Sequence, residues 1–225
     1  DNKFNASFSY LNDKKSGFTN ASVPGTYTGI DWDGAGSYSS HPGKIYNFNM
    51  EKAWENVGKH TIVVGANFKQ EEMVQDRYTL KHWKDENSKD QYYAHDKGKV
   101  QNFALFVQDE YKMSDPVTMY LGARLDYYKK CEGVFWNTTT PLNATSPSET
   151  HVEISPKIAF DYKADDKTNY FVSYGHSFNP PAMYKMYRYS EYTRYWYVPN
   201  PDLKPETSDT FELGMKKELD KDTNF

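Results

Sequence analysis

Apolar and polar side chains alternate with a period of two along much of this chain. The alternation is clearest in 60–68 and 117–128, and it recurs in 102–110, 154–161 and 211–216. Because successive side chains of a β-strand point to opposite faces, each stretch predicts a strand with one apolar and one polar face. The apolar face holds Ile62, Val64, Ala66, Phe68, Phe103, Leu105, Val107, Val117, Met119, Leu121, Ala123, Leu125, Tyr127, Ile154, Ile158, Phe160, Phe211, Leu213 and Met215. The polar face includes Arg124, Asp126, Lys157, Asp161 and Glu212, to which we assign a structural role.

The links between these strands alternate between short and long. The short links are 55–59, 113–116, 163–168 and 220–224, and the long links are 12–43, 71–98, 129–151 and 177–207. The long links exceed the usual connection length in a compact domain. Short turns at one rim and long loops at the other are typical of outer-membrane barrels, whose long loops face outside the cell. The pattern therefore predicts an all-β fold, an antiparallel transmembrane β-barrel.

Aromatic residues are abundant, with 20 Tyr, 13 Phe and 5 Trp, or 17% of the chain. Several lie near the ends of the predicted strands, namely Tyr10, Tyr46, Trp54, Tyr111, Tyr127, Tyr128, Tyr162 and Tyr170. Rings at these positions are expected at the two membrane–water interfaces. The same alternation also fits a water-soluble antiparallel sheet with one wet face. A soluble all-β carbohydrate-binding or adhesion module therefore remains the alternative.

Charge and motif content narrow the function classes. The net charge is −4 and the basic residues are scattered, which argues against nucleic-acid binding. The single cysteine, Cys131, excludes an intrachain disulfide and a thiolate zinc cluster. No apolar run approaches the roughly 20 residues of a membrane helix, and no secretory signal stands at the first residues. We find no nucleophile elbow, phosphate-binding glycine loop or paired metal-spaced histidines, so we predict no enzyme, catalytic residue, cofactor or metal site.

Three segments, in order, resemble the barrel of TonB-dependent outer-membrane receptors. The first is 104–111 followed by 121–127, which is similar to the family's strand pair "alfvqde" and "lGlRyD". The second runs from Ser155-Pro156-Lys157 through 169–175 to Phe178-Asn179-Pro180-Pro181. The third is the most specific: Asn200-Pro201-Asp202-Leu203-Lys204-Pro205-Glu206, followed by Glu212-Leu213-Gly214. Before Val100 only the alternation and the link lengths support the resemblance.

The resemblance implies that residues 1–225 are part of a 22-stranded TonB-dependent receptor β-barrel domain, with the plug domain absent. It implies a receptor in the bacterial outer membrane, surrounded by membrane lipid, that imports a scarce nutrient such as a ferric siderophore or another iron complex. Haem and cobalamin receptors of the same family are alternatives. Energy would come from the TonB protein, which would bind an N-terminal region that this chain lacks.

About eight strands are expected from the pattern, fewer than the family's barrel holds. A self-contained eight-stranded barrel ending in the terminal Phe225 is disfavoured, because 218–225 lack the apolar alternation of a closing strand. We therefore expect an internal fragment of a longer receptor.

The long loop 181–199 is the candidate ligand-binding segment. It carries Tyr184, Tyr187, Arg188, Tyr189, Tyr192, Arg194, Tyr195, Trp196 and Tyr197. Rings can stack on the faces of a ligand, and the two arginines can pair with anionic groups of an iron chelate. The alternative is that these rings pack the loop onto its neighbours.

Histidine placement bears on the choice of ligand. Haem receptors of the family that the chain resembles carry a histidine between the elements equivalent to 178–181 and 200–203, and here none lies between them. This absence counts against haem, although tyrosine can also ligate haem iron. His82, His95, His151 and His176 are near predicted loops and are interpreted as surface histidines.

Overall fold

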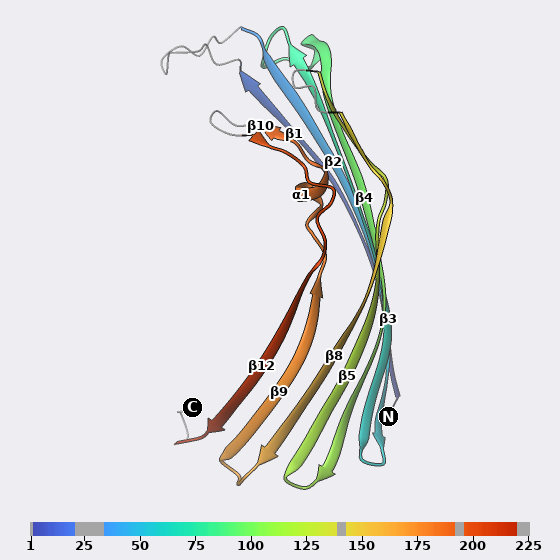
Figure 1. The fold of residues 1–225 in the computed structure, drawn as a ribbon, viewed down its shortest axis with the longest axis vertical. Helices are drawn as coiled ribbons and strands as arrows, with labels where there is room; N and C mark the ends of the chain where they lie inside the picture. Colours follow the sequence, from blue (N-terminus) through green and yellow to red (C-terminus); the bar gives the residue numbers. More distant parts are fainter. Residues whose placement is uncertain (1, 21–33, 139–142, 192–195, 220–225) are drawn as a thin grey trace.

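The computed structural model describes residues 2–20, 34–138, 143–191 and 196–219. Its main feature is one antiparallel sheet, in which eight long strands follow one another in the order β1-β2-β3-β4-β5-β8-β9-β12. The strands are β1 (Asn2–Asn20), β2 (Gly36–Val57), β3 (His60–Leu80), β4 (Lys89–Ser114), β5 (Val117–Lys130), β8 (Glu149–Lys163), β9 (Thr168–Asn179) and β12 (Glu206–Lys217). We call this sheet the wall. It curves so that one face is concave and the other convex (Figure 1).

The antiparallel barrel strands predicted from the alternation are thus confirmed as neighbours in one sheet. Within the described residues the sheet is open, with β1 and β12 at its two edges. The closure of the barrel and its total of 22 strands stay predictions.

Shorter elements lie on the wall. β6 (Gly133–Asn137) pairs with β4 beyond the end of β5, and β7 (Ala144–Ser146) pairs with β6. On the concave side lie helix α1 (Met183–Tyr187) and the two-stranded β10 (Ser190–Glu191) and β11 (Trp196–Tyr197) (Figure 1). A 3-10 turn, η1 (Glu86–Ser88), precedes β4. No helix in the described part of the chain is long and apolar enough to cross a membrane.

Tight turns join the strands at one end of the wall, which we call the short-turn rim. In the β2–β3 turn, Asn56 and Gly58 adopt left-handed backbone conformations, with φ of 59° and 65°. Glycine takes this conformation without strain and asparagine tolerates it, which suits both residues to the turn. Backbone hydrogen bonds from Lys112 N to Lys59 O (2.9 Å) and from Lys163 N to Pro116 O (2.8 Å) tie successive turns together. The predicted short links are confirmed, except 220–224, which lies outside the described residues.

Two of the predicted long links are wrong in their bounds. The link 12–43 and the link 71–98 are largely strand, because β1 and β3 continue to Asn20 and Leu80 and their partners start at Gly36 and Lys89. Above the membrane both faces of a strand can be wet, so the apolar alternation fades while the backbone ladder continues. The links 129–151 and 177–207 agree with the structure within a few residues, apart from short elements inside them.

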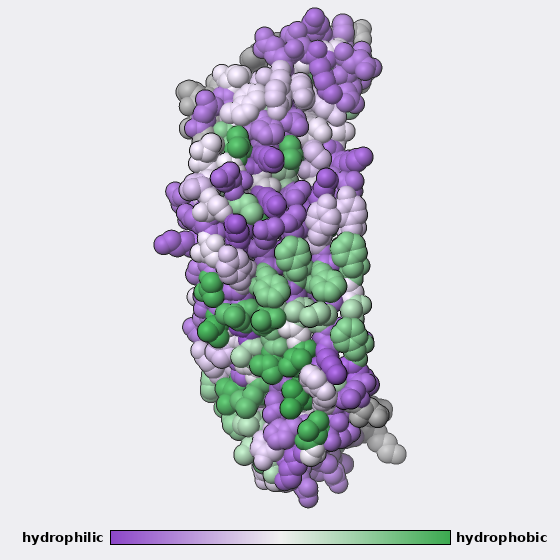
Figure 2. All heavy atoms as spheres, turned by 90° about the vertical axis from the view of Figure 1, so that its right-hand side faces the viewer, coloured by the Kyte–Doolittle hydropathy of each residue, from purple (hydrophilic) through white to green (hydrophobic). Residues whose placement is uncertain are grey.

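The convex face carries the apolar side chains that the alternation predicted. Phe8, Phe48, Phe68, Phe103 and Tyr127 lie in register across β1 to β5 and mark the upper edge of an apolar zone. The side chains below this row are strongly exposed for apolar residues, for example Leu105 (48%) and Ile154 (61%). Figure 2 shows this zone as a hydrophobic band on the convex face, with hydrophilic surface above it. We call it the apolar belt, and exposure on this scale indicates a lipid-facing surface.

The concave face is polar and cross-linked by side chains. Arg124 donates two hydrogen bonds to Asp126, at 2.8 and 3.0 Å, and a third to Asn67 Oδ1 at 2.6 Å. Asn102 Nδ2 also donates to Asp126 (2.9 Å), and Asn67 Nδ2 to Asn49 Oδ1 (2.8 Å). The network joins β2, β3, β4 and β5 and lines a hollow of about 980 Å³. It supports the structural role predicted for the charged residues of this face.

Candidate functional site

The connection between β9 and β12 folds onto the concave face of the wall. Pro180 and Pro181 follow β9 directly, and proline has no backbone N–H to continue a strand ladder. The chain then forms α1, reaches β10 and β11, and returns through 198–205 to β12. In Figure 1 these elements lie inside the curvature of the wall, in its upper half, toward the end opposite the short-turn rim. We call residues 180–205 the inner loop.

Tyr187, at the end of α1, anchors the inner loop to the wall. Its side chain is buried, and its hydroxyl donates to the carbonyl oxygen of Cys131 at 3.0 Å. The ring lies on two glycines: a Cβ added at Gly98 of β4 would be 2.2 Å from ring atom Cδ2, and one at Gly133 of β6 would be 2.3 Å from Cε1. Only a residue without a side chain admits the ring at these positions. Burial raises the pKa of the Tyr187 hydroxyl well above its ordinary value, so it remains a hydrogen-bond donor.

Apolar packing surrounds this anchor. Met183 and Met186 of α1 are buried together with Val100 and Tyr128 of the wall, and these residues form one cluster with Tyr187. Met73, Phe178 and Leu203 pack against the cluster from its margin. A short helix has little stability of its own. The cluster therefore holds α1 in place.

A buried ion pair forms the second anchor. Arg77 of β3 donates from Nη2 to both carboxylate oxygens of Asp96 of β4, at 3.0 and 2.9 Å, and Asp96 is fully buried. Asp96 also accepts the backbone N–H of Tyr189 (3.1 Å), and the Arg77 guanidinium lies 5.3 Å from the centre of the Tyr189 ring. Burial raises the pKa of Asp96 to about 6, although Arg77 acts in the opposite direction. One carboxylate thus joins two strands and the inner loop.

The family motif forms a turn that closes the inner loop. Asn200 donates its N–H to Lys185 O of α1 (2.9 Å), and its side-chain oxygen accepts the N–H of Asp202 (3.0 Å). Lys130 of β5, which is buried, donates to the carbonyl oxygen of Pro201 and pairs with Glu149 at 2.9 Å. Pro205 then leads into Glu206, the first residue of β12. The described contacts give the motif a positioning role.

The structure divides the predicted ligand-binding residues into two groups. Tyr187 and Tyr189 are buried anchors, at 2% and 1% exposure. Tyr184 is 50% exposed, and its ring centre is 6.3 Å from that of Tyr197. Arg188 is half-buried, and its Nε has no hydrogen-bond partner in the described part of the chain. Tyr192, Arg194 and Tyr195 lie outside the described residues, and Trp196 is described only as part of β11.

Positive charge gathers beside this loop. His41 of β2 lies on the concave side, and its Nε2 is 2.7 Å from Ser39 Oγ, which also accepts from Gln75 of β3 (3.1 Å). Burial lowers the pKa of His41, and the charges of Arg188 and Arg77 lower it further. The His41 ring is therefore neutral at pH 7, and Arg77 is paired with Asp96. Arg188 is thus the cation on this side of the inner loop that has no carboxylate partner among the described residues, while Lys185 of the same loop is exposed.

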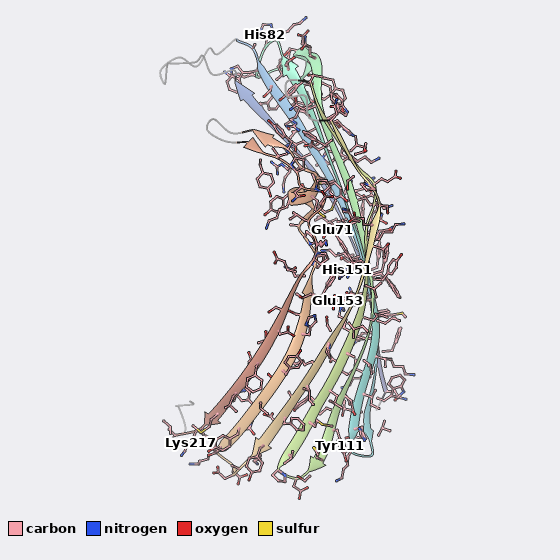
Figure 3. All side chains as sticks on the ribbon, in the orientation of Figure 1. Glu71, His82, Tyr111, His151, Glu153 and Lys217 are labelled. Carbon is pink, nitrogen blue, oxygen red and sulfur yellow. The ribbon has the colours of Figure 1, made fainter. Side chains whose placement is uncertain are left out.

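The histidines near the loops are engaged with neighbours. His151 contacts Glu153 at 3.1 Å and stacks on Phe178 at 5.6 Å between ring centres. His95 contacts Asp76 at 2.8 Å. In Figure 3 His151 and Glu153 lie at mid-height of the wall, while His82 lies at the end opposite Tyr111 and Lys217. Within the described ranges, no group of three or more histidine, cysteine, aspartate or glutamate side chains could hold a metal ion.

The anchors Gly98, Gly133, Arg77 and Asp96 were not identified from the sequence. Gly98 stands at the end of a predicted long link, although a glycine inside a strand signals a close approach by another group. Asp96 and Arg77 are ordinary charged residues in the sequence, and only the pairing of β3 with β4 brings them together.

The sequence of this chain matches a protein family and two curated relatives. The whole chain, residues 1–225, matches the family model described as TonB dependent receptor-like, beta-barrel. Hemin receptors of Yersinia enterocolitica and Yersinia pestis are 31% and 30% identical over 126 and 129 residues. These matches cover 49% and 52% of this chain but only 16% and 17% of the receptors.

Solved structures share the fold at low identity. The copper transporter OprC superposes with a TM-score of 0.69 at 14% identity, over 97% of this chain and 33% of that one. The ferric yersiniabactin uptake receptor FyuA of Yersinia pestis gives 0.65 at 12% identity, over 96% and 31%. This chain thus spans about a third of the length of these solved structures.

Proposed function

Because this chain belongs to the TonB-dependent receptor-like β-barrel family, we propose that it forms part of a receptor that imports a scarce nutrient, most simply a ferric siderophore or another iron complex. Its barrel neighbours are proteins of the bacterial outer membrane, and the apolar belt is the surface that such a location requires. The family comprises transport receptors, which sets aside the soluble adhesion module. The TonB protein, acting through a region outside this chain, would supply the energy.

The inner loop carries this proposal. It is anchored on the concave face by Tyr187 and Tyr189, while Tyr184, Arg188 and Tyr197 remain near its surface. A loop held on a rigid scaffold can present side chains to a ligand with little loss of entropy on binding. We assign ligand contact to Tyr184, Arg188 and Tyr197, together with Tyr192, Arg194, Tyr195 and Trp196 of the same loop. Tyr187 and Tyr189 hold the loop in position.

The side chains favour an anionic ligand with flat unsaturated faces. Aromatic rings supply stacking surface, and a guanidinium pairs with a carboxylate through two parallel hydrogen bonds and with a phenolate oxygen through one. Iron chelates with catecholate, phenolate or carboxylate groups have this chemistry. Among the solved structures that share the fold, FyuA is named as a ferric yersiniabactin uptake receptor.

Haem is the second candidate, because the similar curated proteins are named hemin receptors. Haem also offers a flat face and anionic propionates. Against it, the segment between Pro181 and Asn200 holds no histidine, so a protein ligand to the iron from this segment would have to be a tyrosine.

The test uses the whole natural protein that carries this chain, in a strain lacking other iron receptors. The change is Arg188→Ala with Arg194→Ala, and we expect affinity for the transported iron complex to fall about a hundredfold or more, since each of the two charge-assisted pairs contributes roughly 1.5–3 kcal/mol. Lys185→Ala is the control, because Lys185 is an exposed cation on the same loop. Uptake of a panel of ferric siderophores and of hemin identifies the ligand class. Unchanged affinity in the double variant would sink the assignment of the arginines.

A further inference from the structure

Five lysines lie on the convex face just above the apolar belt, on the side away from the short-turn rim. They are Lys14, Lys44, Lys97, Lys99 and Lys129, and we call them the lysine band. Each is an even number of residues from the aromatic row of its own strand, so its side chain points to the same face as the ring. Lys129 is two residues beyond Tyr127, and Lys99 is four residues before Phe103. The band thus begins about 7 Å and ends about 20 Å along the strands from the row, at ~3.3 Å per residue.

The pairing of the strands brings these lysines close to one another. Lys44 of β2 and Lys99 of β4 are both in register with Glu72 of β3, one on either side. Glu72 accepts a hydrogen bond from Gln70 Nε2 at 2.7 Å. Neighbouring strands are about 4.8 Å apart, so the two ammonium groups share one small area of surface. Besides Glu72, this part of the described chain has two carboxylates: Asp76, which contacts His95 at 2.8 Å, and Glu132, which is exposed in the link between β5 and β6. The zone is therefore net positive although the whole chain is net negative.

Several lysines elsewhere on the wall are paired with carboxylates, whereas others in the described part of the chain, such as Lys59 and Lys112, are not. At the short-turn rim Lys3 lies 2.6 Å from Glu55, and Lys163 lies 2.8 Å from Asp166. On the concave side Lys130 lies 2.9 Å from Glu149. None of the five lysines of the band has a carboxylate within 4.0 Å in the described ranges. Lys14, Lys44 and Lys97 are exposed, so their charge is directed outward.

We propose that the lysine band binds the phosphate groups of the glycolipid headgroups that surround the barrel in the outer leaflet. The strand register places the band directly above the apolar belt, where Figure 2 shows hydrophilic surface, so a lipid whose acyl chains lie on the belt brings its headgroup to this height. An ammonium group is a compact point charge that pairs with phosphate in many orientations. Its long methylene chain can extend along apolar surface toward the headgroup layer. Anionic headgroups thus complete the charge pairs that the chain leaves open.

The consequence for the receptor is a fixed position in the membrane. Attraction between a basic strip and an anionic lipid surface falls off within a Debye length, so the strip must lie at the level of the phosphates. The aromatic row sets the same level from below, because girdles of aromatic residues flank the apolar band of outer-membrane barrels. The two features together would hold the wall at one depth, with the inner loop at the outer side.

The test uses the whole protein that carries this chain, purified in a zwitterionic detergent. The probes are bisphosphorylated lipid A, the same lipid without its phosphates, and inorganic phosphate. Binding is followed by native mass spectrometry and by a fluorescent lipid titration. We expect the natural protein to bind the phosphorylated lipid about tenfold more tightly than the dephosphorylated one, and this preference should shrink as salt is raised.

The variant is K44Q/K99Q/K129Q, which should lose most of that preference. The matched control is K59Q/K112Q/K163Q, which removes the same charge at the short-turn rim and should keep it. If the band variant does not assemble, K44R/K99R/K129R keeps the charge and should bind the phosphorylated lipid like the natural protein. The proposal is then tested on the natural protein, whose preference for the phosphorylated lipid should shrink as salt is raised. Iron-complex affinity measured on the same samples should not change, which separates this proposal from the proposed transport function.

Three results would overturn the proposal. One is equal binding of the phosphorylated and dephosphorylated lipids by the natural protein. Another is an equal loss in the band variant and the rim control. The third is full competition by millimolar inorganic phosphate, which would mean that the band takes free phosphate and not a lipid.

Discussion

Replacing Tyr187 by alanine should release the inner loop from the wall. The ring is 2% exposed and lies on Gly98 and Gly133, and its hydroxyl donates to Cys131 O. Loss of a large buried aromatic side chain costs about 3–5 kcal/mol, of which the hydroxyl bond accounts for about 1 kcal/mol. The cost falls on the docked loop, whose other anchor is the bond from Tyr189 N to Asp96. An equilibrium shift of about 3 kcal/mol corresponds to roughly a hundredfold increase in the opened form.

Amide hydrogen exchange on the whole protein measures this opening directly. In Tyr187→Ala, exchange of the amides in residues 183–189 should accelerate about a hundredfold, while Tyr187→Phe should accelerate it only about fivefold. Tyr184→Ala is the control, because Tyr184 is 50% exposed and should contribute little to docking. The affinity for the iron complex should fall in parallel with protection, because an undocked loop no longer presents its contacts together.

The packing of the Tyr187 ring on the wall can also be tested by changing the glycine beneath it. Gly98→Ala would place a Cβ 2.2 Å from the Tyr187 ring, so the ring must move. Gly122→Ala on neighbouring β5 is the matched control, because its nearest neighbour, Lys157 Cβ, would be 3.7 Å away in ordinary contact. If Tyr187→Ala and Gly98→Ala leave exchange in 183–189 as slow as their two controls do, the docking argument is refuted.

Three further predictions concern the buried Asp96, the family-motif turn and the Arg124–Asp126 contact. Burial raises the pKa of Asp96 from 3.8 to about 6, so the folded state binds this proton more tightly than the unfolded state does. The stability of the folded state should therefore fall by up to about 3 kcal/mol as the pH rises from about 4 to about 6. In thermal unfolding, Asp96→Asn should abolish this dependence of stability on pH. The infrared band of the protonated Asp96 carboxyl should disappear with a midpoint near pH 6, and a midpoint near 4 would contradict the burial argument. Asn200→Ala should weaken the family-motif turn by about 1 kcal/mol and raise proteolysis within 198–205, an effect that Asp202→Asn should not share because only the Asp202 backbone N–H contributes to the turn. Arg124→Leu should leave buried Asp126 without its cation and lower the unfolding temperature sharply, as expected for a loss of about 3–5 kcal/mol; an unfolding temperature equal to that of an exposed variant such as Lys112→Leu would show that the network is not structural.

Much of the wall can be predicted from the local sequence pattern. In 60–68 and 117–128 every second side chain is apolar. Because alternate side chains of a strand point to the same face, all of these apolar side chains lie on one face of the sheet. The pattern therefore determined both the strands and the convex face on which Val64, Leu105 and Leu125 are exposed. The motif 200–206 identified the family because its turn depends on a few neighbouring residues.

Two features needed the pairing of distant segments. β1 to β4 extend well past the expected ends, because hydrogen bonds between backbones continue where both faces are wet and the apolar period disappears. Composition alone also could not separate the aromatic residues of the inner loop. Tyr187 meets two glycines that lie 35 residues apart in the sequence, whereas Tyr184, three residues earlier, remains exposed.

The sequence by itself thus determined that this chain is a barrel wall and where its long loop with aromatic and basic residues lies. Only the tertiary structure decided which of those residues hold the loop and which remain near its surface. The physical reason is that the face of a strand depends on the parity of neighbouring residues, whereas the burial of a loop side chain depends on what the fold brings against it.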